Sequence, residues 1–110
     1  MEYYISANNE YVKATLEKKQ KELTKEIEKA CALAFTKKDI PGYEINIYIF
    51  DRTFSGEIKE KANFTTIYET EHMDAYPHFF CSNNLDKIVA EYEKNTAKVK
   101  ELITKIKKLK

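Results

Sequence analysis

The sequence is poor in the residues that interrupt or cross-link a chain. Its 110 residues include two Gly, two Pro, two Cys and no Trp. Two cysteines, Cys31 and Cys81, are too few for a disulfide framework, so we expect both thiols to be reduced and mostly buried. Because the only glycines are Gly42 and Gly56, the chain has no glycine-rich loop of the kind that binds phosphate.

Long apolar runs are also missing. No run approaches the roughly 20 apolar residues that span a bilayer, and residues 1–6 lack the basic start and long apolar core of a signal peptide. We therefore expect a cytoplasmic protein that does not enter a membrane. A length of 110 residues, with 43% hydrophobic and 34% charged residues, predicts one folded domain over residues 1–110.

Charge of both signs is plentiful, but it is unevenly distributed. Residues 40–82 contain three basic and seven acidic residues, a balance of −4, whereas residues 83–110 contain eight basic and four acidic residues, a balance of +4. The basic residues are nearly all lysines, and Arg52 is the only arginine. Bidentate recognition of phosphate or guanine by arginine is therefore largely excluded.

Two stretches carry apolar residues at helical spacing. One runs from Ser82 to Lys110, and only Asn95 breaks its heptad stripe of Leu85, Ile88, Tyr92, Val99, Leu102, Ile106 and Leu109. The other runs from Asn8 and Asn9 to about Lys38, with Gln20 inside a stripe of Leu16, Leu23, Ile27, Ala30 and Ala34. If the two helices are antiparallel and in contact, Gln20 and Asn95 pair with each other; the alternative is that both sit where the stripes leave the sheet and meet water.

Short segments between and before these helices predict β-strands. Alternation is clearest from Tyr43 to Phe50, and Phe64 to Glu71 predicts a second strand antiparallel to the first. Glu2 to Ser6 predicts a brief first strand, and His78 to Cys81 predicts an edge strand. Asp51 to Asn63 is mostly polar and contains Ser55-Gly56, so it predicts a turn or the irregular end of a hairpin.

The resulting order is β-α-β-β-β-α, which indicates an α+β domain. Two amphipathic helices packed on one face of a small, mostly antiparallel sheet bury one stripe per helix and one face per strand.

Candidate zinc ligands are His72, His78 and Cys81, together with Asp74 or Cys31. The spacing opposes such a site, because in a strand His78 and Cys81 point to opposite faces. We predict surface histidines and a buried thiol, with no metal ion and no cofactor.

Asp51, Glu57 and Lys59 loosely resemble the metal-binding carboxylates and the lysine of a restriction-type nuclease. The same Glu-x-Lys spacing occurs from Glu17 to Lys19, so a solvated turn is the favoured interpretation. No Ser or Cys sits beside a recognisable His base. We predict that the protein is not an enzyme.

Two sets of residues could bind a partner. Lysines gather near the end of the last helix, where they either complement the helix dipole without a partner or neutralise RNA phosphates without sequence preference. Tyr76, Phe79 and Phe80 are either core residues or an exposed patch. An exposed patch there would mark a protein-binding surface or a homodimer contact.

The order β-α-β-β-β-α and the opening from Met1 to Leu16 resemble the ribosome hibernation-promoting factor family. In this opening a strand ends in Ile5, a polar cap follows, and the first core leucine of the helix, Leu16, comes eleven residues after Ile5. The resemblance implies binding in the decoding region of the small ribosomal subunit, where basic helix residues contact ribosomal RNA and block mRNA and tRNA. It implies RNA contacts at Lys18, Lys19, Lys98, Lys100, Lys105 and Lys108.

We therefore expect a non-enzymatic binding protein of one of two kinds. The first is a ribosome-associated, translation-silencing factor that contacts ribosomal RNA through its Lys-rich helices. The second is a small protein-binding inhibitor or adaptor, such as a phage-type antagonist of a host protein, which acts through the acidic sheet region and Tyr76, Phe79 and Phe80.

Overall fold

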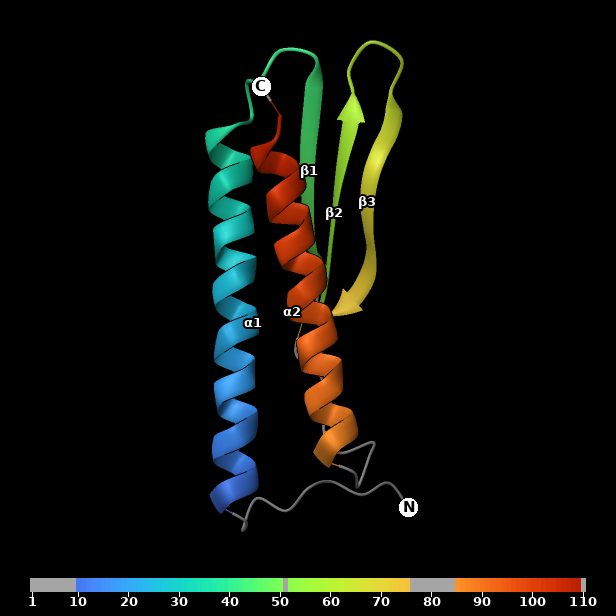
Figure 1. The fold of residues 1–110 in the computed structure, drawn as a ribbon. Helices are drawn as coiled ribbons and strands as arrows, with labels where there is room; N and C mark the ends of the chain where they lie inside the picture. The colour runs from blue at the N-terminus through green and yellow to red at the C-terminus, as the bar shows by residue number, and fades with distance from the viewer. Residues whose placement is uncertain (1–9, 51, 76–84, 110) are drawn as a thin grey trace.

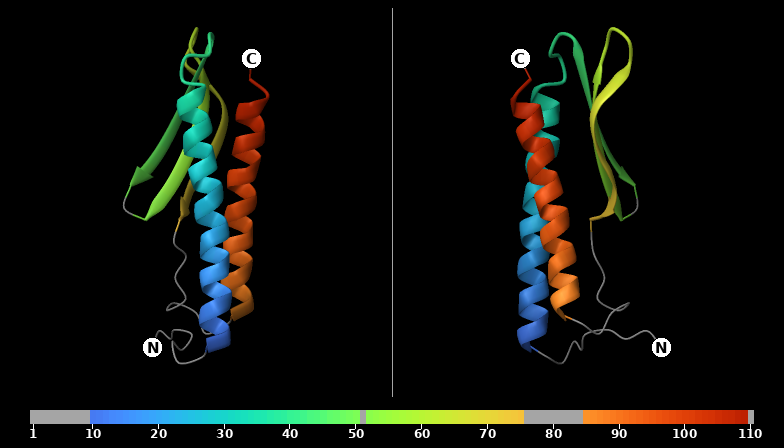
Figure 2. Two further views of the ribbon diagram at one scale, coloured as in Figure 1. Left: turned by 90° about the vertical axis from the view of Figure 1, so that its left-hand side faces the viewer. Right: turned by 45° about the vertical axis from the view of Figure 1, so that its right-hand side comes forward.

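The structure is a computed structural model, and it describes residues 10–50, 52–75 and 85–109. Two helices, α1 (Glu10–Thr36) and α2 (Leu85–Lys107), enclose three strands in the chain: β1 (Tyr43–Phe50), β2 (Thr53–Glu60) and β3 (Thr65–Asp74). The strands form an antiparallel sheet in the order β1-β2-β3, and the two helices, which run parallel to each other, lie on one side of it (Figure 1, Figure 2). The predicted α+β class, with two helices on one face of a small antiparallel sheet, is confirmed.

Two of the predicted strands, Glu2 to Ser6 and His78 to Cys81, lie outside the described residues. The three strands between the helices are therefore not the three that the sequence predicts. Only β1 has the predicted bounds.

The apolar stripe predicted for the last helix is the buried side of α2. From Ile88 to Ile106 its residues are at most 4% exposed: Ile88, Tyr92, Asn95, Val99, Leu102 and Ile106. The stripe of α1 is buried in the same core, with Leu16, Leu23, Ala30 and Ala34. Within the described ranges, no helical segment has the length and apolar character of a transmembrane span.

The two polar residues of the stripes hold the end of β3. Asn95 is 2% exposed, and its Nδ2 donates to the carbonyl oxygen of Asp74 at 2.9 Å. Gln20 donates from Nε2 to the next carbonyl, that of Ala75, at 3.1 Å, and also to Thr24 Oγ1 at 2.9 Å. Both expectations are therefore wrong: the helices run parallel rather than antiparallel, Asn95 does not meet water, and each amide donates to the backbone rather than to the other amide.

β2 occupies residues 53–60 of the segment that the sequence predicts as a turn or the irregular end of a hairpin, and this prediction is wrong. Phe54 and Ile58 face the core with 0% and 1% exposure, and Gly56 lies between them on the same face. A Cβ at Gly56 would lie 2.5 Å from Leu102 Cδ2. The glycine is there because α2 packs directly against the strand, not because the chain turns.

A strand is predicted from Phe64 to Glu71, and β3 is found there with the bounds Thr65–Asp74. Its partner in the sheet differs from the prediction. It pairs with β2, which separates it from β1. Phe64 belongs to the hairpin between the two strands and has a positive φ of 58°. The predicted pairing with β1 is wrong because the sequence pattern predicts no strand between the two.

Lys37, just after α1, fixes the far end of α2. Its Nζ donates to three carbonyl oxygens, those of Ile106 at 3.3 Å, Lys107 at 3.4 Å and Leu109 at 3.1 Å. Of these three carbonyls, that of Ile106 also accepts from the Leu109 N–H at 3.1 Å, and a cation suits the negative end of the helix dipole. The ammonium group therefore joins the ends of the two helices.

Candidate functional site

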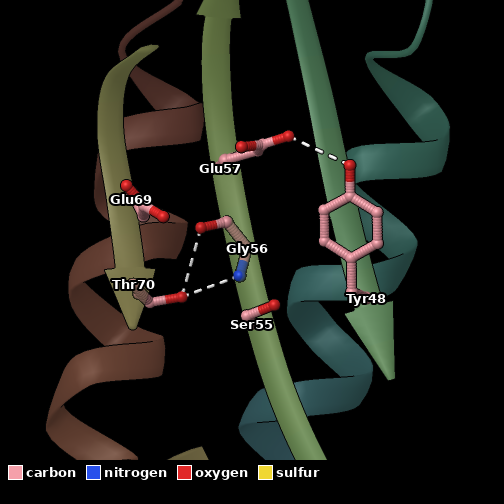
Figure 3. A pocket seen from close by; sticks show the side chains of 6 residues that line it. All are labelled: Tyr48, Ser55, Gly56, Glu57, Glu69 and Thr70. Atoms are coloured by element: carbon pink, nitrogen blue, oxygen red, sulfur yellow. Dashed lines mark hydrogen bonds between the residues drawn. The ribbon is translucent and has the colours of Figure 1, made fainter. Parts of the chain in front are cut away.

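The face of the sheet that points away from the helices is the candidate functional site (Figure 3). Residues directly opposite each other on paired strands share a face. Glu44 lies opposite Lys59, Asn46 opposite Glu57, Tyr48 opposite Ser55, and Glu57 also opposite Glu69 of β3. We call this surface the outer face and define it by Glu44, Asn46, Tyr48, Phe50, Glu57 and Glu69.

The carboxylate of Glu57 is the centre of the outer face. Its Oε2 accepts hydrogen bonds from Tyr48 Oη at 3.0 Å and from Asn46 Nδ2 at 3.1 Å, and it lies 3.8 Å from Lys59 Nζ. Asn46 Nδ2 also donates to Glu44 Oε2 at 3.0 Å. The hydrogen bond to Glu57 raises the pKa of the Tyr48 hydroxyl, because the carboxylate favours its protonated form. Tyr48 is thus fixed in place although it is 50% exposed.

A shallow hollow of about 190 Å³ lies between Tyr48 and Glu69 (Figure 3). At its floor, Thr70 Oγ1 accepts from the Gly56 N–H at 2.8 Å and donates to the Gly56 carbonyl at 3.2 Å. These bonds fall where the β2–β3 register shifts. The hydroxyl satisfies backbone groups that the shifted ladder would otherwise leave without a bond.

The charge around this hollow is mainly negative. Glu57 and Glu69 are directly opposite each other on neighbouring strands, an arrangement that destabilises a sheet through repulsion. Two described cations border the outer face: Lys59 already pairs with Glu57, and Lys98 of α2 lines a hollow beside Glu69. A cationic group from outside the chain would relieve this repulsion.

Exposed apolar side chains continue from the outer face to the end of β1. Phe50 is 80% exposed and Ile49 is 56% exposed, although Ile49 lies opposite the fully buried Phe54. In both views of Figure 2 the end of β1 lies further from the helices than its start. The helices therefore leave this end of the strand uncovered.

The structure places the six lysines implied by the family resemblance in different surroundings. Lys19 is half-buried and bonds to Glu93 of α2 at 2.9 Å, and this hydrogen bond raises its pKa. The Nζ of Lys105 lies 5.5 Å from the centre of the Tyr68 ring, on the β3 side of α2. Lys18, Lys100 and Lys108 are exposed.

Carboxylates lie among these lysines. Lys98 lines a hollow with Tyr68, Glu69 and Glu101, whereas Lys100 lines another with Glu22 and Glu26 of α1. The fold thus brings Lys98 and Lys105 together beside β3 and leaves Lys100 on the other side of α2. The positive charge is divided between two sides of the helix.

The other predicted site residues are only partly described. Tyr76, Phe79, Phe80, His78 and Cys81 lie outside the described residues. In the part of the chain that is described, no group of three or more His, Cys, Asp or Glu residues could hold a metal ion.

Two further predictions concern a thiol and a turn. Cys31 is a half-buried free thiol, and burial raises its pKa. Glu57 and Lys59 belong to β2, so the interpretation of these residues as part of a solvated turn is wrong.

No pattern in the sequence predicts that Glu57 lies beside Tyr48. These side chains meet only because β2 pairs with β1. The polar composition of β2 is not typical of a strand, so the strand is not predicted from the sequence. The alternation of Phe54, Gly56 and Ile58 against Thr53, Ser55 and Glu57 was a signal that could have found it.

Comparisons with known proteins identified no relative of this chain. No family model matches the chain, and neither a curated protein nor a solved structure was found that matches it.

Proposed function

We propose that the chain is a non-enzymatic protein-binding module that holds a basic segment of a partner protein on the outer face of its sheet. The observation that carries this proposal is the exposed, fixed ring of Tyr48 beside the opposed carboxylates of Glu57 and Glu69. A lysine or arginine side chain over this ring would combine a cation–π contact with charge-assisted hydrogen bonds.

Two further features support an adaptor or inhibitor of this kind. Tyr48 is already held by its bond to Glu57, so binding would cost little side-chain entropy. Phe50 adds exposed aromatic area on the same face, and aromatic residues are enriched in protein interfaces.

Fluorescence anisotropy with a labelled Lys- and Arg-rich peptide, and with neutral and acidic peptides of equal length, tests the proposal. We expect binding of the basic peptide alone, weakening as salt increases. Tyr48→Ala should weaken it about tenfold, and Glu69→Gln should weaken it several-fold.

Glu91→Gln is the matched control for Glu69→Gln, because it removes one exposed carboxylate from α2 instead. Equal loss in the Glu69 and Glu91 variants, or equal binding of all three peptides, would contradict a specific site on the outer face.

Ribosomal RNA binding is the second candidate function, favoured by the exposure of Lys18, Lys100, Lys105 and Lys108. A translation-silencing role would rest on this binding. We expect co-sedimentation with small ribosomal subunits at low salt, lost at high salt, and weaker for Lys108→Gln than for Lys61→Gln, which changes an exposed lysine in the β2–β3 hairpin. Absence of co-sedimentation at low salt would rule this candidate out.

A further inference from the structure

β1 is an edge strand of the sheet that residues 10–50, 52–75 and 85–109 form, and its composition is unusually apolar. Six of its eight residues are Ile, Tyr or Phe, yet none of the eight is buried. Edge strands are commonly protected from other strands by lysines, prolines or bulges. β1 has none of these, since it pairs with β2 over eight consecutive residues without a register shift, and Glu44 is its one charged residue.

The free backbone groups of β1 belong to its isoleucines. The Lys61 N–H donates to the Gly42 carbonyl at 2.9 Å, so the Gly42–Lys61 pair is hydrogen-bonded. Hydrogen-bonded pairs alternate along an antiparallel ladder, which assigns Asn46 and Tyr48 to bonds with β2. The N–H and C=O groups of Ile47 and Ile49 therefore point away from β2, at the outer edge of the described sheet.

The other edge of the sheet is different. β3 pairs with β2 through two register shifts, and α2 packs beside it, with Lys105 over the Tyr68 ring. Bulges and charged neighbours of this kind discourage further pairing. The C-terminal half of β1, by contrast, departs from the helices (Figure 2).

We propose that two copies of this chain pair through their β1 strands, antiparallel, about a twofold axis at Tyr48. In this register Tyr48 faces Tyr48 of the second copy, and Ile47 faces Ile49 of the second copy on both sides of the axis. The two Ile47–Ile49 pairs each exchange two backbone hydrogen bonds.

A second copy fits this edge better than an unrelated strand, because the segment is complementary to itself. Aromatic and aliphatic residues meet their own kind across the axis, which stabilises cross-strand pairs. Glu44 lies away from the axis, so no like charges of β1 meet at its centre. An isologous contact of this type closes at a dimer and forms a continuous six-stranded sheet with both outer faces on one side.

Sedimentation equilibrium from micromolar to millimolar concentration tests the dimer. Wild type should associate as concentration rises, and Ile49→Lys should remain monomeric, because it places a charge at the edge. Ile67→Lys is the matched control: Ile67 is 46% exposed on β3, close to the 56% of Ile49, and its variant should associate like wild type. Circular dichroism checks that each variant is folded. A monomeric wild type at all concentrations, or an Ile49→Lys variant that still associates, would overturn the proposal.

Amide hydrogen exchange locates the contact. Protection of the Ile47 and Ile49 amides should rise with concentration, whereas the Asn46 and Tyr48 amides should be protected at every concentration. Protection of Ile47 and Ile49 that is independent of concentration would contradict pairing at this edge.

Opposite charges at Tyr48 test the axis itself. Tyr48→Lys and Tyr48→Glu should each associate poorly alone, and an equimolar mixture should restore association, because the two positions face each other. A mixture that stays monomeric would exclude this register. The dimer does not rest on the proposed peptide binding: monomeric Ile49→Lys keeps the outer face, so basic-peptide binding by this variant tests that function separately.

Discussion

β1 and β2 are neighbouring strands of eight residues each, and their burial runs opposite to their hydrophobicity. β1, rich in Ile, Tyr and Phe, has no buried residue, whereas β2, with Thr53, Ser55, Glu57, Lys59 and Glu60, has four. The difference comes from position: β2 is central and lies under α2, while the end of β1 leaves the helices (Figure 2).

This comparison separates two uses of apolar residues. In β2 a few apolar side chains, with a glycine between them, are enough to complete the core because the helix approaches closely. In β1 the apolar side chains exceed what the core uses, and the excess is exposed at an edge. Such an excess is the expected mark of a surface that binds something.

A pair of phenylalanines gives the largest expected contrast. Phe54→Ala removes a fully buried side chain of β2 and should cost about 3–5 kcal/mol of unfolding free energy. Phe50→Ala removes an 80% exposed side chain of β1 and should cost less than about 0.5 kcal/mol. Urea unfolding at low micromolar concentration measures both. Similar losses in the two variants would show that the end of β1 is packed in the monomer.

The end of β3 is hydrogen-bonded to the helices, unlike the end of β1. The principal tie is the hydrogen bond from Asn95 to the Asp74 carbonyl oxygen. Asn95→Asp replaces a donor by a carboxylate facing the Asp74 carbonyl oxygen in a buried site, and should cost about 3 kcal/mol. Gln20→Glu makes the same change at a half-buried position and should cost less than about 1 kcal/mol. Thermal unfolding of the two variants compares them, and an Asn95→Asp loss no greater than that of Gln20→Glu would be evidence against this tie.

Tyrosine ionisation at high pH compares a buried tyrosine of the core, Tyr92, with an exposed tyrosine of β1, Tyr48. Burial, together with the Asp74 carboxylate, raises the pKa of Tyr92 from 10 to about 12, although Arg52 opposes the shift. The unfolded state then releases this proton first, so stability is full below pH 10 and falls as pH rises toward 12.

A shift of this size corresponds to about 2–3 kcal/mol. Tyr92→Phe should therefore lose less stability than wild type over this range, as measured by urea unfolding at each pH. Tyr48→Phe, at a hydroxyl that is exposed and whose pKa is raised mainly by the bond to Glu57, should depart from the wild-type curve much less than Tyr92→Phe. An unchanged alkaline loss in Tyr92→Phe would assign it to another group.

The smallest of the four effects concerns the close contact at Gly56. Gly56→Ala adds a methyl group against Leu102 and should cost about 1–2 kcal/mol. In a Leu102→Ala background the same substitution should cost almost nothing, because the space is then open. A cost that persists in the double variant would indicate that the backbone at Gly56, rather than contact with α2, disfavours alanine.

The helices are the part of the fold that the sequence predicts well, because their stripes repeat over several turns. Every described residue of the α2 stripe from Ile88 to Ile106 is buried, including Asn95. β2 is missed because its inner face has only Phe54 and Ile58 as large apolar residues, with Gly56 between them. Local composition cannot show that Leu102, 46 positions later, would cover that glycine.

The candidate site depends on the same missing strand. Glu57 meets Tyr48 and Glu69 only through the pairing of β2 with both neighbours. The sequence does show the acidic balance of residues 40–82, which indicates the character of this region but not its geometry.

The contact of Lys37 with the end of α2 also bears on when the chain can fold during its synthesis. The residues that it joins are 69 to 72 positions apart, and the buried stripe of α2 belongs to the last quarter of the chain. The core around Phe54 lacks Tyr92, Val99 and Leu102 until α2 has left the ribosome. We therefore expect nascent chains to remain protease-sensitive until α2 is exposed, and to fold in one step once it is.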